Sequence, residues 1–300
     1  MKATARRTRL VRLIVAPVAI VLALVCAAPA GAAPANALEG SNYLALGDSV
    51  AFGYTPPAVT PPAAYLDAAN FAGYPEFFAA RTGLRLANAS CPGETTASLI
   101  TVTAQSNGCE NSVGSPVGYR TFFPLHVSYP GAQLDYAVQY LLSHPRTRLV
   151  TIDIGANDLF VCQQVTPSQC TGTDFQAALA EISANLSTIY SALRNRAHYH
   201  HDLVLLSYYS LDYRDPALVA QIQALNAALA APTVRFGGVV ADGFTAFLRA
   251  SQSTGGDPCA AGLLIALPTG GCDVHPTARG HATLAAAVAQ AVSADARVAA

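Results

Sequence analysis

Residues 43–53 read YLALGDSVAFG. Within this stretch, the apolar run Tyr43–Gly47 ends in a glycine and is followed at once by Asp48 and Ser49. A short apolar run that ends in turn-forming residues is typical of a buried strand. The stretch therefore predicts the first strand of an α/β fold, and it places a serine hydroxyl just beyond the carboxyl end of that strand.

Strands and helices alternate over the rest of the chain. Further strands are predicted by the apolar runs at 84–89, 148–154, 203–207 and 234–241. Helical spacing of apolar residues predicts helices at 74–81, 133–142, 175–194, 216–230 and 277–292. This order implies a mostly parallel sheet with helices on both faces. We therefore expect a single α/β domain, residues 38–300, built as a three-layer sandwich.

Four long loops separate these elements, at 50–73, 92–132, 159–173 and 251–275. Loops of this length in a compact domain are usually functional. The first three follow strands at their carboxyl ends, which is where ligands bind in open α/β sheets. We therefore look for the functional residues in these loops.

The first 37 residues have the layout of a secretory signal peptide. Five basic residues precede an apolar run at 13–28, and small residues follow at 30–37. A spanning helix is the alternative, but the apolar run is shorter than the ~20 residues that a span needs. A lipid anchor on Cys26 is disfavoured by the bulky Val25 before it. We expect a signal peptide at 1–37, with the general or twin-arginine export route left open, and a secreted protein without a stable membrane anchor.

The charge of the exported chain argues against some partners. Removing residues 1–37 takes away five of the 17 basic residues and none of the 18 acidic ones, which leaves a net charge of −6. Lys2 is the only lysine. A chain of this kind offers no basic patch to hold nucleic acid. We therefore expect no nucleic-acid partner, and we expect a monomer.

Six cysteines follow residue 37, and they fall into pairs of near neighbours. Six cysteines allow 15 pairings, and the sequential pairing is favoured because short loops close most easily. This predicts disulfides Cys91–Cys109, Cys162–Cys170 and Cys259–Cys272, which suits an oxidising compartment. A zinc site is the alternative, but it would favour C-x-x-C pairs, which the sequence lacks.

Four short patterns carry groups that can do chemistry, although each also has a simpler interpretation. Ser49 can attack an ester if it is exposed and beside a base, or it can cap the next helix. Gly93 can bring a backbone N–H close to a ligand, or it is an ordinary turn glycine. Asn157 can donate its side-chain N–H into a site, or it can form a turn. His275 can reach across the strand ends, or it can lie at the surface near a helix cap.

Taken together and in this order, the four patterns resemble the sequence blocks of the SGNH (GDSL-type) hydrolase superfamily. Gly47-Asp48-Ser49 resembles the block that carries the serine nucleophile, Gly93 the block-two glycine, Asn157 the block-three asparagine, and His275-Pro276 the histidine block. The resemblance spans about residues 43–291. The stretches 43–53 and 88–96 are similar to secreted actinobacterial esterases and lipases of this group, which also carry three local disulfides.

The resemblance implies a flavodoxin-like α/β fold and a serine esterase mechanism that uses no metal or cofactor. Ser49 would attack the ester carbonyl, and His275 would take the serine proton and return it to the leaving alcohol. The backbone N–H groups of Ser49 and Gly93 and the amide of Asn157 would form the oxyanion hole. Water would then hydrolyse the acyl-enzyme.

One position departs from the family pattern. The superfamily usually places an aspartate three residues before the histidine, where this chain has Cys272, and the nearest acid is Asp273, two residues before. Two arrangements are open. Asp273 can reach His275 through a bent loop and complete a triad, or the backbone carbonyl of Cys272 can orient His275 in a dyad. We favour the dyad, because a shift of one residue along an extended loop turns a side chain to the opposite side.

Other polar residues are expected to be structural. His281 is a rival base, but we expect it to pack inside the last helix. The histidines of 198–201 could bind a metal, although a solvated turn is the simpler interpretation. Asp48 and Asp158 are expected to hold their turns by accepting backbone N–H groups.

The resemblance implies an ester substrate, whose acyl chain and leaving group the sequence does not specify. Loop aromatics could line an acyl pocket or form small cores under the loops: Tyr54, Phe71, Tyr74, Phe122, Phe123 and Phe160. The main alternative function is an exported, non-catalytic binding protein on the same fold. A flavodoxin-like cofactor binder is disfavoured, because 51–53 makes a poor phosphate-binding loop.

Overall fold

The computed structural model describes residues 40–298, so the expected signal peptide at 1–37 lies outside the described residues. The central sheet has five parallel strands in the order β2-β1-β3-β4-β5. These strands are β1 Asn42–Gly47, β2 Arg85–Asn88, β3 Thr147–Asp153, β4 Asp202–Leu206 and β5 Val239–Ala241. This is the flavodoxin-like order. The chain adds β2 on one side of β1 and the later strands on the other side, and this change in the order of strands opens a crevice at the carboxyl ends of β1 and β3.

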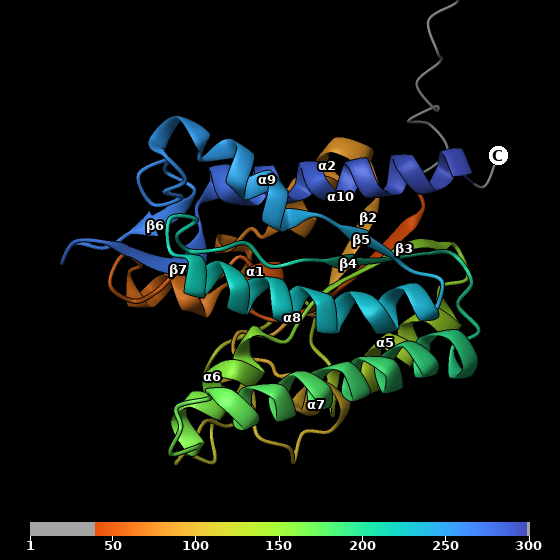
Figure 1. The fold of residues 1–300 in the computed structure, drawn as a ribbon. Helices are drawn as coiled ribbons and strands as arrows, with labels where there is room; N and C mark the ends of the chain where they lie inside the picture. Colours follow the sequence, from red (N-terminus) through yellow and green to blue (C-terminus); the bar gives the residue numbers. More distant parts are fainter. Residues whose placement is uncertain (1–39, 299–300) are drawn as a thin grey trace, which may run out of the picture. The chain divides into compact units, whose positions relative to one another are not determined.

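Helices cover both faces of this sheet, as predicted (Figure 1). One face carries α2 Tyr74–Thr82, α9 Gly243–Ala250 and α10 Ala278–Val298. The other carries α5 Gln133–Ser143, α7 Gly172–Ser191 and α8 Pro216–Arg235. The sheet is apolar on both sides, since all four residues from Tyr43 to Leu46 are 0% exposed. Both faces of a parallel sheet are buried in this way when helices cover them.

Short elements build the region around the carboxyl ends of the strands. They are α1 Ser49–Phe52, α3 Thr96–Ile100, α4 Tyr119–Phe122, α6 Ala156–Val165 and an antiparallel hairpin of β6 Leu264–Ala266 with β7 Cys272–Pro276. Short 3-10 helices occur at Pro62–Leu66, Ala68–Asn70 and Gln252–Thr254, and a π-helical turn, Ala192–Arg196, extends α7.

Several boundaries differ from the sequence predictions: the expected loops at 50–73 and 92–132 contain short helices, and the helices expected at 216–230 and 277–292 are longer. The predicted strand 234–241 is wrong over most of its length, because α8 continues to Arg235 and β5 begins only at Val239. The apolar run does not mark a buried strand here, because Val234 is 66% exposed at the end of the helix rather than buried in the sheet. The supposed loop 159–173 is helical as far as Val165, and the supposed loop 251–275 contains the β6–β7 hairpin.

The three predicted disulfides, Cys91–Cys109, Cys162–Cys170 and Cys259–Cys272, are present. Each joins residues that are at most 18 apart in the sequence. They lie in the segments after β2 and β3 and at the start of β7, so they tie down the loops that surround the sheet's carboxyl edge.

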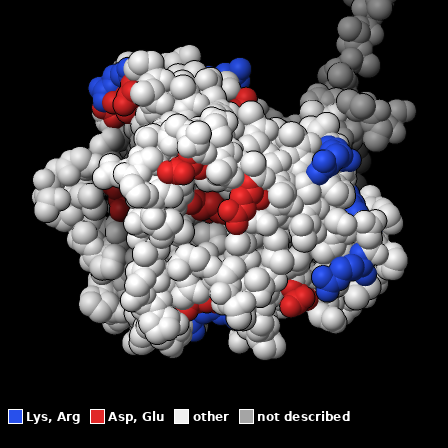
Figure 2. Space-filling model, turned by 60° about the horizontal axis from the view of Figure 1, so that its bottom comes forward, with Lys and Arg blue, Asp and Glu red and all other residues white. Residues whose placement is uncertain are grey.

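Charge is sparse on the face that carries α5 to α8. Figure 2 shows this face with acidic groups near its centre and blue groups toward its rim, each group small and separate from the next. The basic groups do not merge into a continuous surface on this face. Within residues 40–298, α8 alone has the length and hydropathy of a membrane span. One such helix is weak evidence of a span, and α8 packs on α7 and β4.

Candidate active site

Ser49 sits at the carboxyl end of β1, as the first residue of α1. The capping residue of α1 is Asp48, whose Oδ1 accepts the N–H of Val50 at 2.9 Å, so Ser49 does not cap the helix. Gly47 has φ +134°, and a Cβ at this position would lie 2.1 Å from the carbonyl oxygen of Asp153. Only glycine fits such a turn. The turn leaves Ser49 partly exposed while its neighbours are buried.

Gly93 is required by the packing of the loop that follows β2. It has φ +84°, and a Cβ there would meet the backbone of Asn107 and Gly108 at 2.7 Å. The carbonyl of Gly93 also accepts the N–H of Asn107 at 2.8 Å. The bare backbone of Gly93 therefore serves close packing between two parts of one loop, in addition to any contact with a ligand.

Asn157 is the second residue of α6, just beyond the carboxyl end of β3, and it is 6% exposed. Its Oδ1 accepts a hydrogen bond from Asn107 Nδ2 at 2.8 Å, and its Nδ2 donates to Asp48 Oδ2 at 3.3 Å. An amide nitrogen carries two protons. With one directed at Asp48, the other is available to the cavity that Asn157 lines.

His275 lies in β7, and its Nδ1 is hydrogen-bonded to Asp273 Oδ1. The same carboxylate oxygen accepts the backbone N–H of His275 at 3.0 Å. This local turn folds the Asp273 side chain back onto the ring two residues ahead. The geometry contradicts our preference for a dyad in which the Cys272 carbonyl orients His275. The alternation argument failed because the carboxylate bonds the backbone of its own strand.

Electrostatics favour an ionised Asp273 beside the imidazole. Burial acts to raise the pKa of Asp273, but the hydrogen bonds and charge of His275 outweigh burial and hold this pKa below its ordinary value. An ionised carboxylate on Nδ1 fixes the tautomer in which Nε2 can accept a proton. The ring of Tyr54 packs edge-on against His275 with centroids 5.0 Å apart, which further restricts the imidazole.

The four predicted groups line one cavity of about 340 Å³. Ser49, Gly93, Asn157 and His275 all face it, so the fold gathers residues that are up to 226 positions apart. Apolar and aromatic side chains complete its walls: Val50, Tyr54, Pro92, Tyr119, Phe160, Tyr209, Leu211, Ile222 and Val274. A mostly apolar cavity with a few convergent polar groups is typical of a small-molecule site.

The loop aromatics divide between the two roles considered for them. Tyr54 and Phe160 line the cavity. Phe71 and Phe123 belong to a second apolar cluster with Phe52, Tyr65 and Tyr119, and this cluster adjoins the cavity through Tyr119 and Tyr54. Tyr74 is part of the main core, and Phe122 is 63% exposed.

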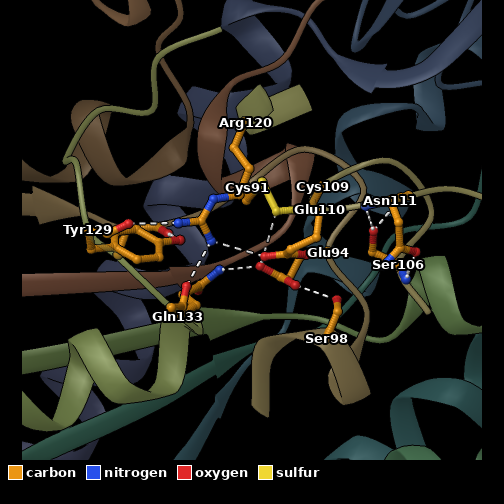
Figure 3. Close-up of polar contacts among 12 residues, drawn as sticks. Cys91, Glu94, Ser98, Ser106, Cys109, Glu110, Asn111, Arg120, Tyr129 and Gln133 are labelled. Carbon is orange, nitrogen blue, oxygen red and sulfur yellow. Dashed lines mark hydrogen bonds and ion pairs between the residues drawn. A yellow bond between two sulfur atoms is a disulfide. The ribbon is translucent and has the colours of Figure 1, made fainter. Parts of the chain in front are cut away.

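A buried polar cluster anchors the loop that carries Gly93 and Asn107 (Figure 3). Glu94 is 0% exposed and accepts hydrogen bonds from Ser98 Oγ and from Gln133 Nε2. Gln133 also accepts the N–H of Gly47 at 2.7 Å, so it connects this loop to the turn before Ser49. Burial first, and then the charge of Glu110, raise the pKa of Glu94 well above its ordinary value.

Arg120 balances the charge of this cluster. It pairs with Glu110 at 3.0 Å, donates to the carbonyl of Tyr129 at 2.7 Å and lies over the Tyr129 ring. Among residues 40–298, one group of three potential metal ligands comes close together, namely Cys91, Glu94 and Cys109. Its two sulfur atoms form a disulfide and are not thiolates.

The residues expected to be structural occupy structural positions. His281 is 3% exposed inside α10 and stacks on Phe77, and burial and then the charge of His275 lower its pKa to about 3. Asp158 accepts the N–H of Thr96 at 2.9 Å and so joins α6 to α3.

Sequence reasoning missed four residues that support the site. Asn107 and Gln133 hold Asn157 and Gly47, as described above. Tyr208 and Tyr209 follow β4, and their hydroxyl groups donate to Asp48 Oδ2 at 2.5 Å and to the carbonyl of Val274 at 2.6 Å. No sequence pattern distinguishes them among 13 tyrosines.

The fold and the four blocks define a class: a hydrolase with the SGNH fold. The chain belongs to the GDSL-like lipase/acylhydrolase family, a family of carboxylic ester hydrolases, whose model matches residues 45–283. No match was found among curated proteins.

Solved structures share the fold at low sequence identity. Phospholipase A1 from Streptomyces albidoflavus is 19% identical, with a TM-score of 0.53 over 84% of this chain and 99% of that one. A lipase from a goat rumen metagenome is 15% identical, with a TM-score of 0.53 over 84% and 97%. An acetylxylan esterase from Geobacillus stearothermophilus is 15% identical, with a TM-score of 0.51 over 85% and 94%.

Proposed function

We propose that this protein is a secreted serine carboxylic-ester hydrolase. Ser49 is the nucleophile, His275 is the general base and then the general acid, and Asp273 orients His275 and stabilises its protonated form. The observation that carries the proposal is the meeting of Ser49, Gly93, Asn157 and His275 on one cavity, with Asp273 bound to the distal nitrogen of the imidazole.

The reaction follows from these positions. His275 Nε2 takes the Ser49 proton as the hydroxyl attacks the ester carbonyl, and then protonates the departing alkoxide. The backbone N–H groups of Ser49 and Gly93 and the second Nδ2 proton of Asn157 stabilise the oxyanion. Losing one such donor typically costs ~3 kcal/mol of transition-state stabilisation. Water, activated by His275, then releases the acid.

Ester hydrolysis is the reaction, and the acyl chain and the alcohol are left to experiment. Similar folds belong to a phospholipase A1, a lipase and an acetylxylan esterase, so the fold alone does not select among esters. The apolar cavity walls favour an acyl group with some hydrocarbon. The reaction calls for no metal or cofactor, and we propose that a monomer suffices, because all the groups named come from one chain.

The secreted location is part of the proposal. It rests on the signal-like composition of residues 1–37 and on the three disulfides, which persist in oxidising compartments. Expression of the full chain in a secreting bacterial host should yield a protein in the medium whose N-terminus lies near residue 38. Retention of the uncleaved chain in the membrane would contradict this location.

The activity is tested with p-nitrophenyl acetate, butyrate and palmitate and the mature protein. Ser49→Ala and His275→Ala should each lower kcat/KM by at least about a thousandfold. His200→Ala is the control, because His200 is exposed in the turn before β4. Folded protein that hydrolyses no ester, with its disulfides intact, would favour the non-catalytic binding protein instead. The order of rates on the three esters would separate esterase from lipase.

A further inference from the structure

Asp48 stands between the serine turn and the oxyanion asparagine, and it is 1% exposed. Its two carboxylate oxygens have different partners. Oδ1 accepts the Val50 N–H at 2.9 Å and caps α1. Oδ2 accepts Asn157 Nδ2 at 3.3 Å and the Tyr208 hydroxyl at 2.5 Å. The tyrosine contact is the shorter of the two, so the phenol has the stronger influence on where Oδ2 lies.

Tyr208 is itself held firmly in place. It is 6% exposed, and its backbone N–H and carbonyl both bond to the side-chain amide of Asn226 in α8, at 2.8 Å each. Burial first, and then the negative charge of Asp48, raise the pKa of Tyr208 well above its ordinary value. The hydroxyl therefore keeps its proton and acts as a donor.

We propose that Tyr208 is a positioning residue for the oxyanion hole: its hydroxyl fixes Asp48 Oδ2, and this oxygen in turn holds the Asn157 amide with its second N–H directed into the cavity. The inference rests on the proposed function. It joins three residues that follow three neighbouring strands, β1, β3 and β4.

The geometry explains why the amide needs this support. Asn107 holds Asn157 Oδ1 at 2.8 Å, but this single bond leaves the amide plane able to rotate about the Oδ1 contact. The second contact, with Asp48, is long at 3.3 Å and weakens further if Oδ2 moves away. A fixed Oδ2 therefore sets the direction of the N–H on which oxyanion stabilisation depends.

The test is a double-mutant cycle on p-nitrophenyl butyrate hydrolysis. Tyr208→Phe keeps the ring and removes the hydroxyl. It should lower kcat on the order of tenfold with KM within about twofold, because the lost contact acts on the transition state. In an Asn157→Ala background the same change should have less than about a twofold effect, because the group that it positions is gone.

Tyr190→Phe is the matched control. Tyr190 is buried as well, at 0% exposed, and its hydroxyl bonds Thr233 Oγ1 at 2.9 Å in the packing of α7 on α8. Tyr190→Phe should lower the free energy of unfolding without changing kcat. The proposal is overturned by equal losses from Tyr208→Phe in both backgrounds, by a change confined to KM, or by a similar kcat loss in Tyr190→Phe.

Two further measurements cover the remaining outcomes. If Tyr208→Phe does not fold, Asp48→Asn keeps the size of the side chain and a cap for Val50 but replaces the acceptor facing Asn157 by a donor. Asp48→Asn should lower kcat by the same factor as Tyr208→Phe, and this effect should likewise fall below about twofold in the Asn157→Ala background. If the wild-type protein cleaves no ester, the proposed function fails, and a crystal structure of Tyr208→Phe still decides the inference. A rotated Asn157 amide supports it, and an unchanged amide overturns it.

Discussion

At the scale of single residues, the position of the acid before His275 decides how the imidazole is held. Asp273 is one residue closer to the histidine than the family pattern expects, yet its carboxylate bonds both Nδ1 and the backbone N–H of His275. One carboxylate therefore shapes the turn and orients the ring. Because the Asp273 side chain makes both contacts, position 273 is sensitive even to a substitution that preserves the shape of the side chain.

Asp273→Asn should lower kcat/KM for p-nitrophenyl butyrate by at least several hundredfold. The amide has nearly the same shape but removes the negative charge that stabilises the imidazolium, and it permits the wrong tautomer. The measurement is steady-state hydrolysis, with circular dichroism to confirm the fold. Retention of most activity would show that a backbone carbonyl, such as that of Cys272, does the orienting.

At the scale of elements, the segment between β2 and α5 holds two site residues on a long irregular stretch. Gly93 and Asn107 are fixed by backbone packing, and the buried polar cluster around Glu94 holds the same segment (Figure 3). Glu94 and Glu110 share a single cation, Arg120, and Glu94 has the more deeply buried carboxyl. Burial and the neighbouring charge of Glu110 raise the pKa of Glu94 well above its ordinary value, which favours its neutral, hydrogen-bonding form over the charged one.

Glu94→Gln should therefore change the free energy of unfolding at pH 7 by less than about 1 kcal/mol, because the amide has the shape of the neutral acid that the raised pKa favours. Glu110→Gln should lower the free energy of unfolding by more than Glu94→Gln does, since it leaves the partly buried Arg120 without its counter-charge. Urea unfolding of both variants measures the difference. An equal or larger loss in Glu94→Gln would mean that Glu94 is ionised.

At the scale of the whole molecule, burial of carboxyl groups near the site makes stability depend on pH. Asp153, at the end of β3, is 1% exposed, and its carboxyl group lies beside Asp48 and Tyr74. Burial first, and then the charge of Asp48, raise the pKa of Asp153 well above its ordinary value of 3.8. The folded protein thus keeps a proton that the unfolded chain releases above about pH 4.

The sign of the effect follows from linkage. The stability that Asp153 contributes is complete below about pH 4 and is lost as pH rises toward its folded pKa, at up to about 1.4 kcal/mol per pH unit. Asp153→Asn removes this proton, so its stability relative to wild type should increase as pH rises. Urea unfolding of both proteins at pH 5, 7 and 9 checks this, and parallel pH profiles would contradict it.

Much of the fold could be predicted because its signals are local. Apolar runs marked β1, β3 and β4, and helical spacing marked α2, α5 and α7, within a few residues of their bounds. The same local reasoning failed at 234–241, where an apolar run belongs to the end of α8 and not to a strand. A run of apolar residues does not reveal which partner will cover it.

The sequence by itself determined the family, the class of the fold, the candidate groups Ser49, Gly93, Asn157 and His275, and the pairing of nearby cysteines, because each depends on short patterns or on residues close along the chain. The tertiary structure alone decided that Asp273 reaches His275, that Asn107 bonds Asn157 and Tyr208 bonds Asp48, and that Asp153 and Glu94 lie buried beside other carboxyl groups. These relations depend on the direction of a side chain or on the packing of distant segments. Tyr208 and Asp48 are 160 residues apart, and they meet only because parallel strands bring their carboxyl ends to one edge of the sheet.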